Sequence, residues 1–503
     1  MINSCEQYHE ESSYDRHGMS GHLLDWANQP SVFKVYQGID PLEMPREVGL
    51  PKSHVSSLLL EQDGTKGSVD EIGDLSRILL LTNTLTARAR HPDGDFYYRS
   101  AASAGALYPT EVYVATRGIN GLEDGLYHFA IHLHGLHPLR QGDFGSHVLE
   151  MTRMQGEGIP RLTFFLTAIF FRSAWKYRAR AYRYHLLDTG HVLENLILAL
   201  RAQDLPADLS YDFDDQGVNR FLGIDEKREV ALAVVHVFGS EEAHRTRVEA
   251  EVLESPREIL QASIVSAKEV EYPVIGEMHQ VSSQIIELEV PGTSMAREIG
   301  PQVEDWTKIR GLPAWPEKLA YTEALFQRRS KRNFVERAIA AGQMSAFLEA
   351  LCAGEDRDGR APYETYESVL AIGILVNKVD GLAQGFYLLD RPSRTIGMVA
   401  ASSFTEKMAR ICLDQMWVAN AGVLFLFLVN LDVLSRTWGP RGYRYAMLSA
   451  GRLGQKLYIA STAMELGCCG IGAFYDGEAV ELLGLNDRSR LLYLVAVGAV
   501  KRL

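Results

Sequence analysis

The chain has 503 residues, of which 46% are hydrophobic and 23% are charged, and its formal net charge is −13. A chain of this length exceeds what one hydrophobic core usually supports, so we expect more than one domain. The acidic balance disfavours a nucleic-acid groove, and no apolar run reaches the roughly 20 residues that span a bilayer.

The cellular compartment is indicated by the N-terminal residues and the cysteines. The chain begins M-I-N-S-C-E-Q-Y-H-E-E, which is polar and acidic and therefore unlike a signal peptide. The five cysteines are odd in number and have no C-x-x-C spacing, a pattern typical of reduced thiols. We therefore expect a cytoplasmic protein with neither membrane nor nucleic-acid partners.

Residues 1–60 contain several prolines and scattered aromatic residues, and we expect them to form an arm that wraps around a core. A helix is predicted from Ile72 to Thr84, where apolar residues recur at helical spacing. The loop Ser103 to Pro109 leads into a strand predicted at 111–114. A second strand, buried on both faces, is predicted from Thr163 to Phe171.

The stretch Trp175 to Tyr184 combines one lysine, three arginines and four aromatic residues, and it leads into an apolar helix. A similar stretch, T-W-G-P-R-G-Y-R-Y, begins at Thr437. A shift of 261 positions aligns Arg180 with Arg441 and continues without a gap through the helix that follows. The sequence therefore predicts an internal duplication.

The two copies define the expected domains, which are 61–240 and 320–503, joined by a connector over 241–319. The connector includes a strand-like run, Q-I-I-E-L-E-V, from Gln284 to Val290. Strands that alternate with helices, and a strand that closes each copy, predict an α+β architecture. Apolar residues and glycines line one face of the helix after each motif, so we expect the copies to pack as a dimer fused into one chain.

Two motifs of the second copy are suited to ligand binding. The run Gln327 to Phe334, Q-R-R-S-K-R-N-F, places three arginines and a hydroxyl at an expected helix start, which suits a phosphate. Its alternative is a solvated helix start. The run C-G-I-G-A from Cys469 is expected to form a small-residue turn on which a flat ring could lie, with an ordinary tight turn as the alternative.

The first copy lacks both motifs but keeps complementary ones. It has the loop Ser103 to Pro109, in which we expect exposed N–H groups, and the pair Lys176–Tyr177, where the second copy has Thr437–Trp438. We therefore expect two half-sites that together form one site. The alternative for Lys176 is a lysine that extends to solvent at a helix start.

These motifs resemble those of one enzyme family and, more specifically, those of a group within it. The arginine–serine run, the glycine turn and a basic residue near the chain end resemble the nitroreductase family of flavin enzymes. The motifs R-x-x-x-S-A-G-A-L-Y-P from Arg99 and K-Y-R-x-R-x-Y-R-Y from Lys176 are similar to those of the SagB/ThcOx-type dehydrogenases. Those enzymes are FMN-dependent azoline oxidases of thiazole/oxazole-modified peptide biosynthesis. The resemblance implies a tandem, nitroreductase-like α+β fold that forms an intrachain pseudo-dimer.

The resemblance also implies roles for individual residues. The FMN phosphate and ribityl chain would be held by Arg328, Arg329, Ser330, Arg332 and Lys501. The isoalloxazine would lie along Gly470, Ile471 and Gly472. The residues that cross from the first copy would be Ser103, Gly105 and Leu107. Lys176 and Tyr177 match the catalytic pair of the group, and no metal site is expected.

The implied reaction converts an azoline to an azole on a peptide or related substrate by removing a hydride and a proton. Oxygen is the expected electron acceptor, which would give hydrogen peroxide. The alternatives are an NAD(P)H-dependent nitro or quinone reductase and a non-catalytic partner subunit of a modification complex. The expected partners are the substrate and other enzymes of a peptide-modification pathway, with the chain a monomeric pseudo-dimer or a homodimer.

Overall fold

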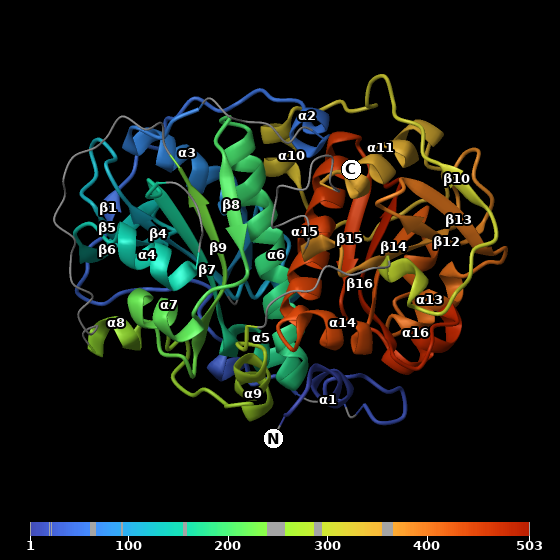
Figure 1. Cartoon of the computed structure of the whole chain (residues 1–503), viewed down its shortest axis with the longest axis horizontal. Coiled ribbons are helices and arrows are strands. Elements are labelled where there is room, and N and C mark those ends of the chain that lie inside the picture. The colour runs from blue at the N-terminus through green and yellow to red at the C-terminus, as the bar shows by residue number, and fades with distance from the viewer. Residues whose placement is uncertain are drawn as a thin grey trace. The chain divides into compact units, whose positions relative to one another are not determined.

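The structure is a computed structural model that describes residues 2–19, 21, 23–60, 67–91, 94–153, 158–238, 257–285, 294–354 and 366–501. The chain divides into two compact units (Figure 1). Unit 1 comprises Met1–His22, Lys52–Gln62 and Gln280–Leu503. Unit 2 comprises Leu23–Pro51 and Asp63–His279. Unit 2 therefore holds most of the first copy, and unit 1 holds the second copy.

Unit 2 is built on a seven-stranded antiparallel sheet with the strand order β1-β6-β5-β4-β7-β9-β8. Its strands are β1 Leu42–Glu43, β4 Thr110–Thr116, β5 Gly125–Ala130, β6 Gly135–Gln141, β7 Leu162–Ile169, β8 Ala207–Ser210 and β9 Glu229–Val237. A separate hairpin joins β2 Leu85–His91 to β3 Gly94–Arg99. The central strand β7 is buried at every position, which explains its uninterrupted apolar sequence.

The helices of unit 2 surround this sheet. They are η1 Trp26–Asn28, α3 Ile72–Thr82, η2 Ala104–Ala106, α4 Gly145–Thr152, α5 Phe170–Tyr177, η3 Arg178–Arg180, α6 Ala181–Arg201, α7 Asp215–Leu222 and α8 Arg257–Gln261. The helix α9 Pro273–Val281 begins in unit 2. The long helix α6 packs against α3 and against strands β4, β7 and β9 (Figure 1).

Unit 1 has a second seven-stranded antiparallel sheet, with the order β10-β13-β12-β11-β14-β16-β15. Its strands are β10 Trp306–Lys308, β11 Ala371–Val376, β12 Gly385–Asp390, β13 Thr395–Ala400, β14 Val423–Asn430, β15 Gly467–Ile471 and β16 Ser489–Gly498. Its helices are α1 Cys5–Glu11, α2 Val55–Leu60, η4 Met295–Arg297, α10 Tyr321–Gln327, α11 Ala341–Cys352, α13 Thr405–Ile411, η5 Met416–Asn420, α14 Leu431–Trp438, α15 Gly442–Ala463 and α16 Asp476–Leu483.

The two sheets have the same strand order, which confirms the predicted duplication and its α+β architecture. The elements β7, α5, α6 and α7 each begin 261 positions before β14, α14, α15 and α16. The match extends to the backbone after the last of these helices. Gly223 and Gly484 follow α7 and α16 with positive φ of 69° and 61°, a conformation that favours glycine.

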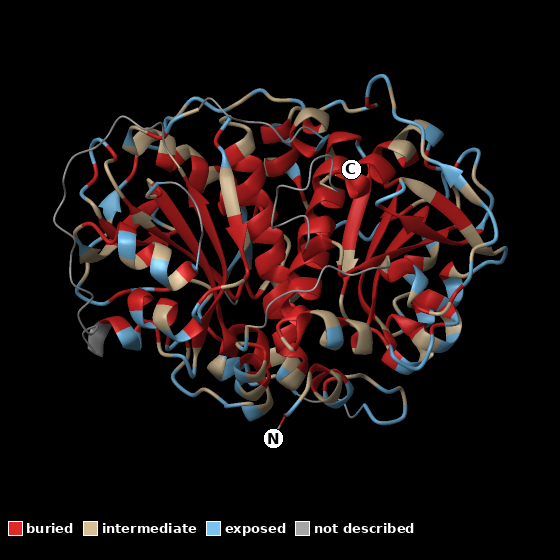
Figure 2. Cartoon of the chain, in the orientation of Figure 1, coloured by how far each residue is buried: buried red, intermediate tan, exposed pale blue. Residues whose placement is uncertain are grey.

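Burial follows the sequence pattern in both units. Figure 2 shows the central strands and the helices α6 and α15 as buried, and all residues from Ala181 to Leu200 fall in that class. The N-terminal arm is less loop-like than expected, because it contains α1 and α2 and buries Tyr8, Lys34 and Val55. In the described ranges, no helix is long and apolar enough to cross a membrane.

Two local predictions were wrong. The arginine run does not start a helix, because α10 ends at Gln327 and Arg328 leaves it with φ −55° and ψ 125°. Gly470 and Ile471 do not form a turn, because they belong to β15 and pair with β16. In both places the backbone joins the edge of a sheet, a long-range pairing that the local sequence does not reveal. Most of the strand-like run from Gln284, residues 286–290, lies outside the described residues.

Candidate functional site

In unit 1 the arginine run lies beside β15 and the C-terminal segment. Ser330 forms a parallel bridge with Cys468, and the Lys331 N–H donates to the carbonyl of Cys468 at 2.9 Å. The Lys501 N–H donates to the carbonyl of Asn333 at 3.3 Å. Three segments that are far apart in the sequence therefore meet along one sheet edge.

Tyr458 on α15 connects these segments. Its Oη lies 2.8 Å from Ser330 Oγ and accepts the N–H of Gly470 at 2.7 Å. The Arg328 guanidinium lies over its ring, 5.3 Å from the centroid. Burial raises the pKa of Tyr458 well above its usual value, so the phenol stays protonated and can donate to Ser330. Sequence reasoning missed this residue, because it lies on the apolar face of a helix.

Positive charge collects at this sheet edge. Arg332 and Lys501 are exposed, and neither forms an ion pair with the residues that the structure describes. The Arg332 guanidinium lies 5.6 Å from the centroid of the Trp417 ring, and it hydrogen-bonds to the Cys469 thiol. Guanidinium and ammonium groups that are exposed and not engaged in ion pairs are suited to binding an anion such as a phosphate.

Four predicted residues of unit 1 lie at positions for which the fold itself gives a partial explanation. A Cβ on Gly470 would lie 1.7 Å from Tyr493 Oη, so packing against that tyrosine already requires the glycine. Ile471 is buried in β15, and Gly472 follows the strand. Arg329 Nη1 donates to two carbonyls of the preceding turn, at 3.1 and 2.6 Å. These residues therefore carry less weight for ligand binding than Arg328, Arg332 and Lys501.

In unit 2 the predicted turn and the predicted catalytic pair are neighbours. A Cβ on Gly105 would lie 2.9 Å from Tyr177 Oη and 3.4 Å from Lys176 Nζ. Lys176 Nζ lies 5.4 Å from the centroid of the Tyr177 ring. Leu107 and Tyr177 also share an apolar cluster with Trp175. The structure thus brings together Lys176, Tyr177, Gly105 and Leu107, which are up to 72 positions apart in the sequence.

Ser103 organises this turn from within. Its Oγ donates to Asp188 Oδ2 at 2.6 Å and accepts the N–H of Tyr108 at 2.9 Å. The Ala104 N–H donates to the same carboxylate, 3.1 Å from Oδ1. The turn was expected to expose several amides, but those of Ala104 and Tyr108 are occupied. Among the described residues no group accepts a hydrogen bond from the N–H of Gly105, so this amide can donate to a ligand.

Asp188 is a second residue that sequence reasoning missed. It lies on α6, buried at 5% exposure, and burial raises its pKa to about 7 although Ser103 and Ala104 both donate to it. The available signal was an aspartate inside a helix predicted to be buried, in the segment H-L-L-D-T-G-H. A carboxyl group with this pKa changes charge near neutral pH and thereby affects the turn that it holds.

The raised pKa of Asp188 predicts a pH-dependent stability. A carboxyl group whose folded pKa of about 7 exceeds its usual 3.8 binds its proton more tightly in the folded state. Its contribution to stability is therefore present at low pH and lost as the pH rises through about 7. Asp188→Asn should remove this dependence, so that the variant gains stability relative to the wild type between pH 5 and pH 8. Urea denaturation at the two pH values measures the effect.

The exposed acid Asp40 provides the control, since Asp40→Asn should leave the pH dependence of the urea midpoint unchanged. Equal pH slopes for the wild type and Asp188→Asn would contradict the prediction. Asparagine keeps an acceptor for Ser103, so the substitution changes the charge while the turn can persist.

Backbone strain also marks this region of unit 2. Arg178, directly after Tyr177, has φ 50° and ψ −133°, and the matching residue of unit 1 is Gly439 with φ 61° and ψ −167°. Ala106 and Tyr108 in the turn also have positive φ, 54° and 47°. Non-glycine residues rarely adopt such conformations, which cost of order 1–3 kcal/mol each and collect at functional sites.

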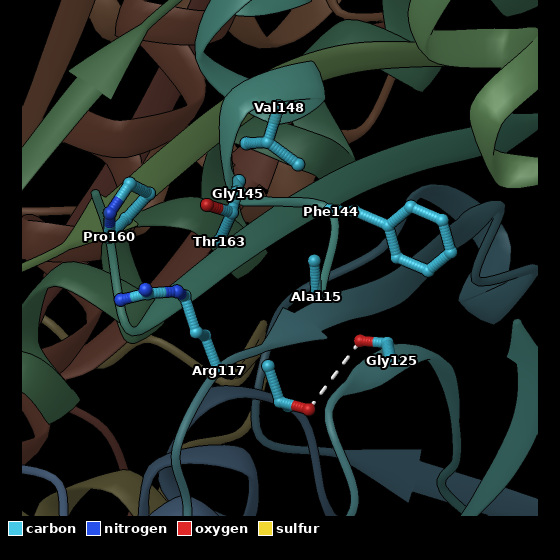
Figure 3. Close-up of a pocket in the computed structure, with 9 residues that line it drawn as sticks. Ala115, Arg117, Gly125, Phe144, Gly145, Val148, Pro160 and Thr163 are labelled. Atoms are coloured by element: carbon cyan, nitrogen blue, oxygen red, sulfur yellow. Dashed lines mark hydrogen bonds between the residues drawn. The ribbon is translucent and has the colours of Figure 1, made fainter. Parts of the chain in front are cut away.

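Unit 2 also contains a pocket whose lining includes none of these residues, and Figure 3 shows the side chains that line it. It is lined by Ala115, Thr116, Arg117, Gly125, Phe144, Gly145, Val148, Pro160 and Thr163. The pocket adjoins the C-terminal end of β4, whereas the Ser103 turn precedes the other end of that strand, at Thr110. The lining residue Arg117 forms an ion pair with Asp143 at 2.8 Å. We therefore do not assign the pocket to the candidate site. Across the described ranges no cluster of His, Cys, Asp and Glu could hold a metal ion.

The model of the nitroreductase family matches residues 73–240 and 389–499, together more than half of the chain. The chain belongs to the nitroreductase family. A crystal structure of a nitroreductase-family protein from Anabaena variabilis is 25% identical, with a TM-score of 0.78, and the match covers 99% of this chain and 100% of that one. The predicted tandem nitroreductase fold is therefore confirmed.

Curated relatives match parts of the chain. A nitroreductase-type protein of Methanocaldococcus jannaschii is 27% identical over 178 residues, which are 35% of this chain and 90% of that protein. The trifolitoxin-processing protein TfxB of Rhizobium leguminosarum bv. trifolii is 28% identical over 34% of this chain and 48% of its own length. The microcin B17-processing protein McbC of Escherichia coli is 28% identical over 32% of this chain and 59% of its own length. The chain thus spans about half of each processing protein.

Proposed function

We propose that the chain is an FMN-dependent oxidoreductase that binds the flavin phosphate in unit 1. The observation that carries this proposal is the group of cations at the edge of β15, where Arg332 and Lys501 have no acidic partner among the described residues. Arg328 adds a buried guanidinium held over Tyr458. This donor set fits the dianionic phosphate of FMN, and FMN, when bound, supplies the hydride acceptor.

We further propose that the substrate is an azoline ring on a peptide, which is dehydrogenated to an azole. Support comes from the motifs at Arg99 and Lys176 and from the similarity to TfxB and McbC, which are named for the processing of trifolitoxin and of microcin B17. The conversion removes a hydride and a proton from adjacent ring atoms. In this proposal Lys176 accepts the proton, and the Tyr177 hydroxyl beside Gly105 orients the ring.

The proposal predicts one FMN per chain, because only the second copy has the arginine run. Heat should release the flavin, whose absorbance near 450 nm can be compared with the protein concentration. A ratio of one supports the proposal. A ratio of two would contradict a single site, and a chain purified and reconstituted without any flavin would instead indicate a non-catalytic partner subunit.

The substrate class is tested separately with the flavin-loaded chain. We expect a thiazoline-containing peptide to be converted to the thiazole, with a loss of two mass units per ring and with oxygen consumed. A chain that binds FMN yet oxidises no azoline, and instead reduces nitro compounds with NADPH, would overturn the substrate and leave the flavin proposal intact.

A further inference from the structure

A buried histidine of unit 1 lies between a tyrosine and an aspartate. His9 on α1 has its Nδ1 3.1 Å from Tyr443 Oη and its Nε2 3.5 Å from Asp476 Oδ1. The rings of His9 and Tyr443 meet edge to face, with centroids 6.0 Å apart and planes at 77°. His9 is fully buried, so its ring nitrogens depend on neighbouring protein groups rather than on solvent.

Unit 2 repeats the arrangement almost atom for atom. His279 on α9 has its Nδ1 3.2 Å from Tyr182 Oη and its Nε2 3.5 Å from Asp215 Oδ1. The rings of His279 and Tyr182 are 6.1 Å apart at 80°. In each unit the tyrosine lies in the first turn of the long helix, and the aspartate is the first residue of the helix that follows β8 or β15. One histidine thus joins the starts of two helices.

The tyrosines and aspartates obey the 261-position shift of the duplication, but the histidines do not. His9 and His279 are 270 positions apart, nine more than that shift. They nevertheless lie in matching sequences, Y-H-E-E-S-S from Tyr8 and M-H-Q-V-S-S from Met278. In both sequences a buried residue precedes the histidine, and two residues separate the histidine from a pair of serines. The helices α1 and α9 are therefore copies of one element, separated from their domains by connections of different length.

The order of the chain makes these contacts reciprocal. Helix α1 precedes the first copy, yet it belongs to unit 1, which the second copy builds. Helix α9 precedes the second copy, yet His279 belongs to unit 2, which the first copy builds. We propose that Tyr443–Asp476 and Tyr182–Asp215 are equivalent docking sites for a helix of the H-x-x-S-S type, and that the two repeats have exchanged these helices.

The two serines that follow α9 are contacted by the second copy. Arg444 of unit 1 donates from Nε to Ser282 Oγ and from Nη2 to Ser283 Oγ, each at 2.8 Å. Arg441 Nη1 donates to the carbonyl of Ser283 at 2.9 Å. Both arginines belong to the repeated stretch T-W-G-P-R-G-Y-R-Y, so in the second copy this stretch binds the arm that follows α9. Its arginines are structural there.

The proposed swap of α1 and α9 between the repeats is tested by amide hydrogen–deuterium exchange of the full chain, measured by mass spectrometry. His9→Ala should speed exchange about tenfold in the first turns of α15 and α16, the scale expected from losing one or two buried hydrogen bonds. The rate of amide hydrogen exchange should be unchanged in the first turns of α6 and α7, which belong to the copy that follows His9 in sequence. His279→Ala should have the opposite pattern. His17→Ala, an exposed histidine of the same arm, is the matched control and should change neither.

The other possible outcomes would contradict the inference. If His9→Ala loosened α6 and α7 instead, each helix would serve its own repeat and the exchange would be wrong. If no segment changed, the histidines would not be docking residues. Should an alanine variant fail to fold, Tyr443→Phe and Tyr182→Phe remove only the hydroxyl that contacts the histidine and must show the same two patterns with smaller effects. Flavin binding plays no part in this test, which is independent of the proposed function.

Discussion

Replacing both Arg328 and Arg332 with alanine should remove nearly all FMN from the purified chain. Charge-assisted hydrogen bonds contribute roughly 1.5–3 kcal/mol each, and every 1.4 kcal/mol is about a factor of ten in affinity. The double variant should therefore bind FMN at least a hundredfold more weakly. Titrating flavin into the stripped protein, followed by quenching of flavin fluorescence, measures the change.

Lys331→Ala is the matched control for this experiment. Lys331 lies in the same run with the same charge, and its bond to Cys468 is made by the backbone N–H, which the substitution keeps. Flavin affinity should fall little in this variant, apart from a modest loss of general attraction. Because Arg328 is buried against Tyr458, circular dichroism and thermal melting must show that the double variant is folded. A folded double variant that keeps its flavin would refute the phosphate site.

The duplication and the α+β architecture could be predicted because they depend on local patterns. Apolar runs such as Leu162–Ile169 and the aromatic–basic stretches repeat in one register, and the register survives in the structure. Lys176 and Gly105 were also named from the family motifs, but their adjacency in unit 2 was not predicted and is a long-range contact. The two copies within one chain can be compared position by position. A difference between them therefore points to candidate site residues without reference to other proteins.

The missed features depend on long-range contacts. Tyr458 has the sequence environment of a core residue, and only the pairing of Ser330 with Cys468 places it beside the arginine run. That same pairing makes the run extended, which is why a helix start was the wrong prediction for Arg328. Asp188 is an aspartate in an apolar helix until the Ser103 turn folds onto it.

The repeated histidines illustrate the same limit. His9 and His279 lie in matching six-residue segments, but their spacing of 270 positions falls outside the gapless register of 261. A comparison at a fixed shift therefore cannot detect them. The contacts to Tyr443 and Tyr182 show their equivalence, because the two geometries agree although the connections to the domains differ in length.

Lys176→Ala should leave flavin bound while nearly abolishing turnover. Lys176 belongs to unit 2, whereas the cations proposed for the FMN phosphate belong to unit 1, so its loss should not affect the yellow colour of the protein. Removing a positioned base typically lowers the rate by about 10²–10⁴. The measurement is the steady-state oxidation of a thiazoline peptide by the variant and the wild type at equal flavin content.

Thr437→Ala is the matched control, because Thr437 occupies the position of Lys176 in the second copy and carries no ionisable group. Its turnover should remain close to that of the wild type. Tyr177→Phe separates proton transfer from orientation: it keeps the ring that packs beside Leu107 and removes the hydroxyl next to Gly105. If Lys176→Ala oxidised the peptide at the wild-type rate, Lys176 would be a structural lysine beside a strained turn. The proton would then have to leave through another group, and Asp188, with its pKa near 7 and its bonds to the same turn, would be the first residue to test.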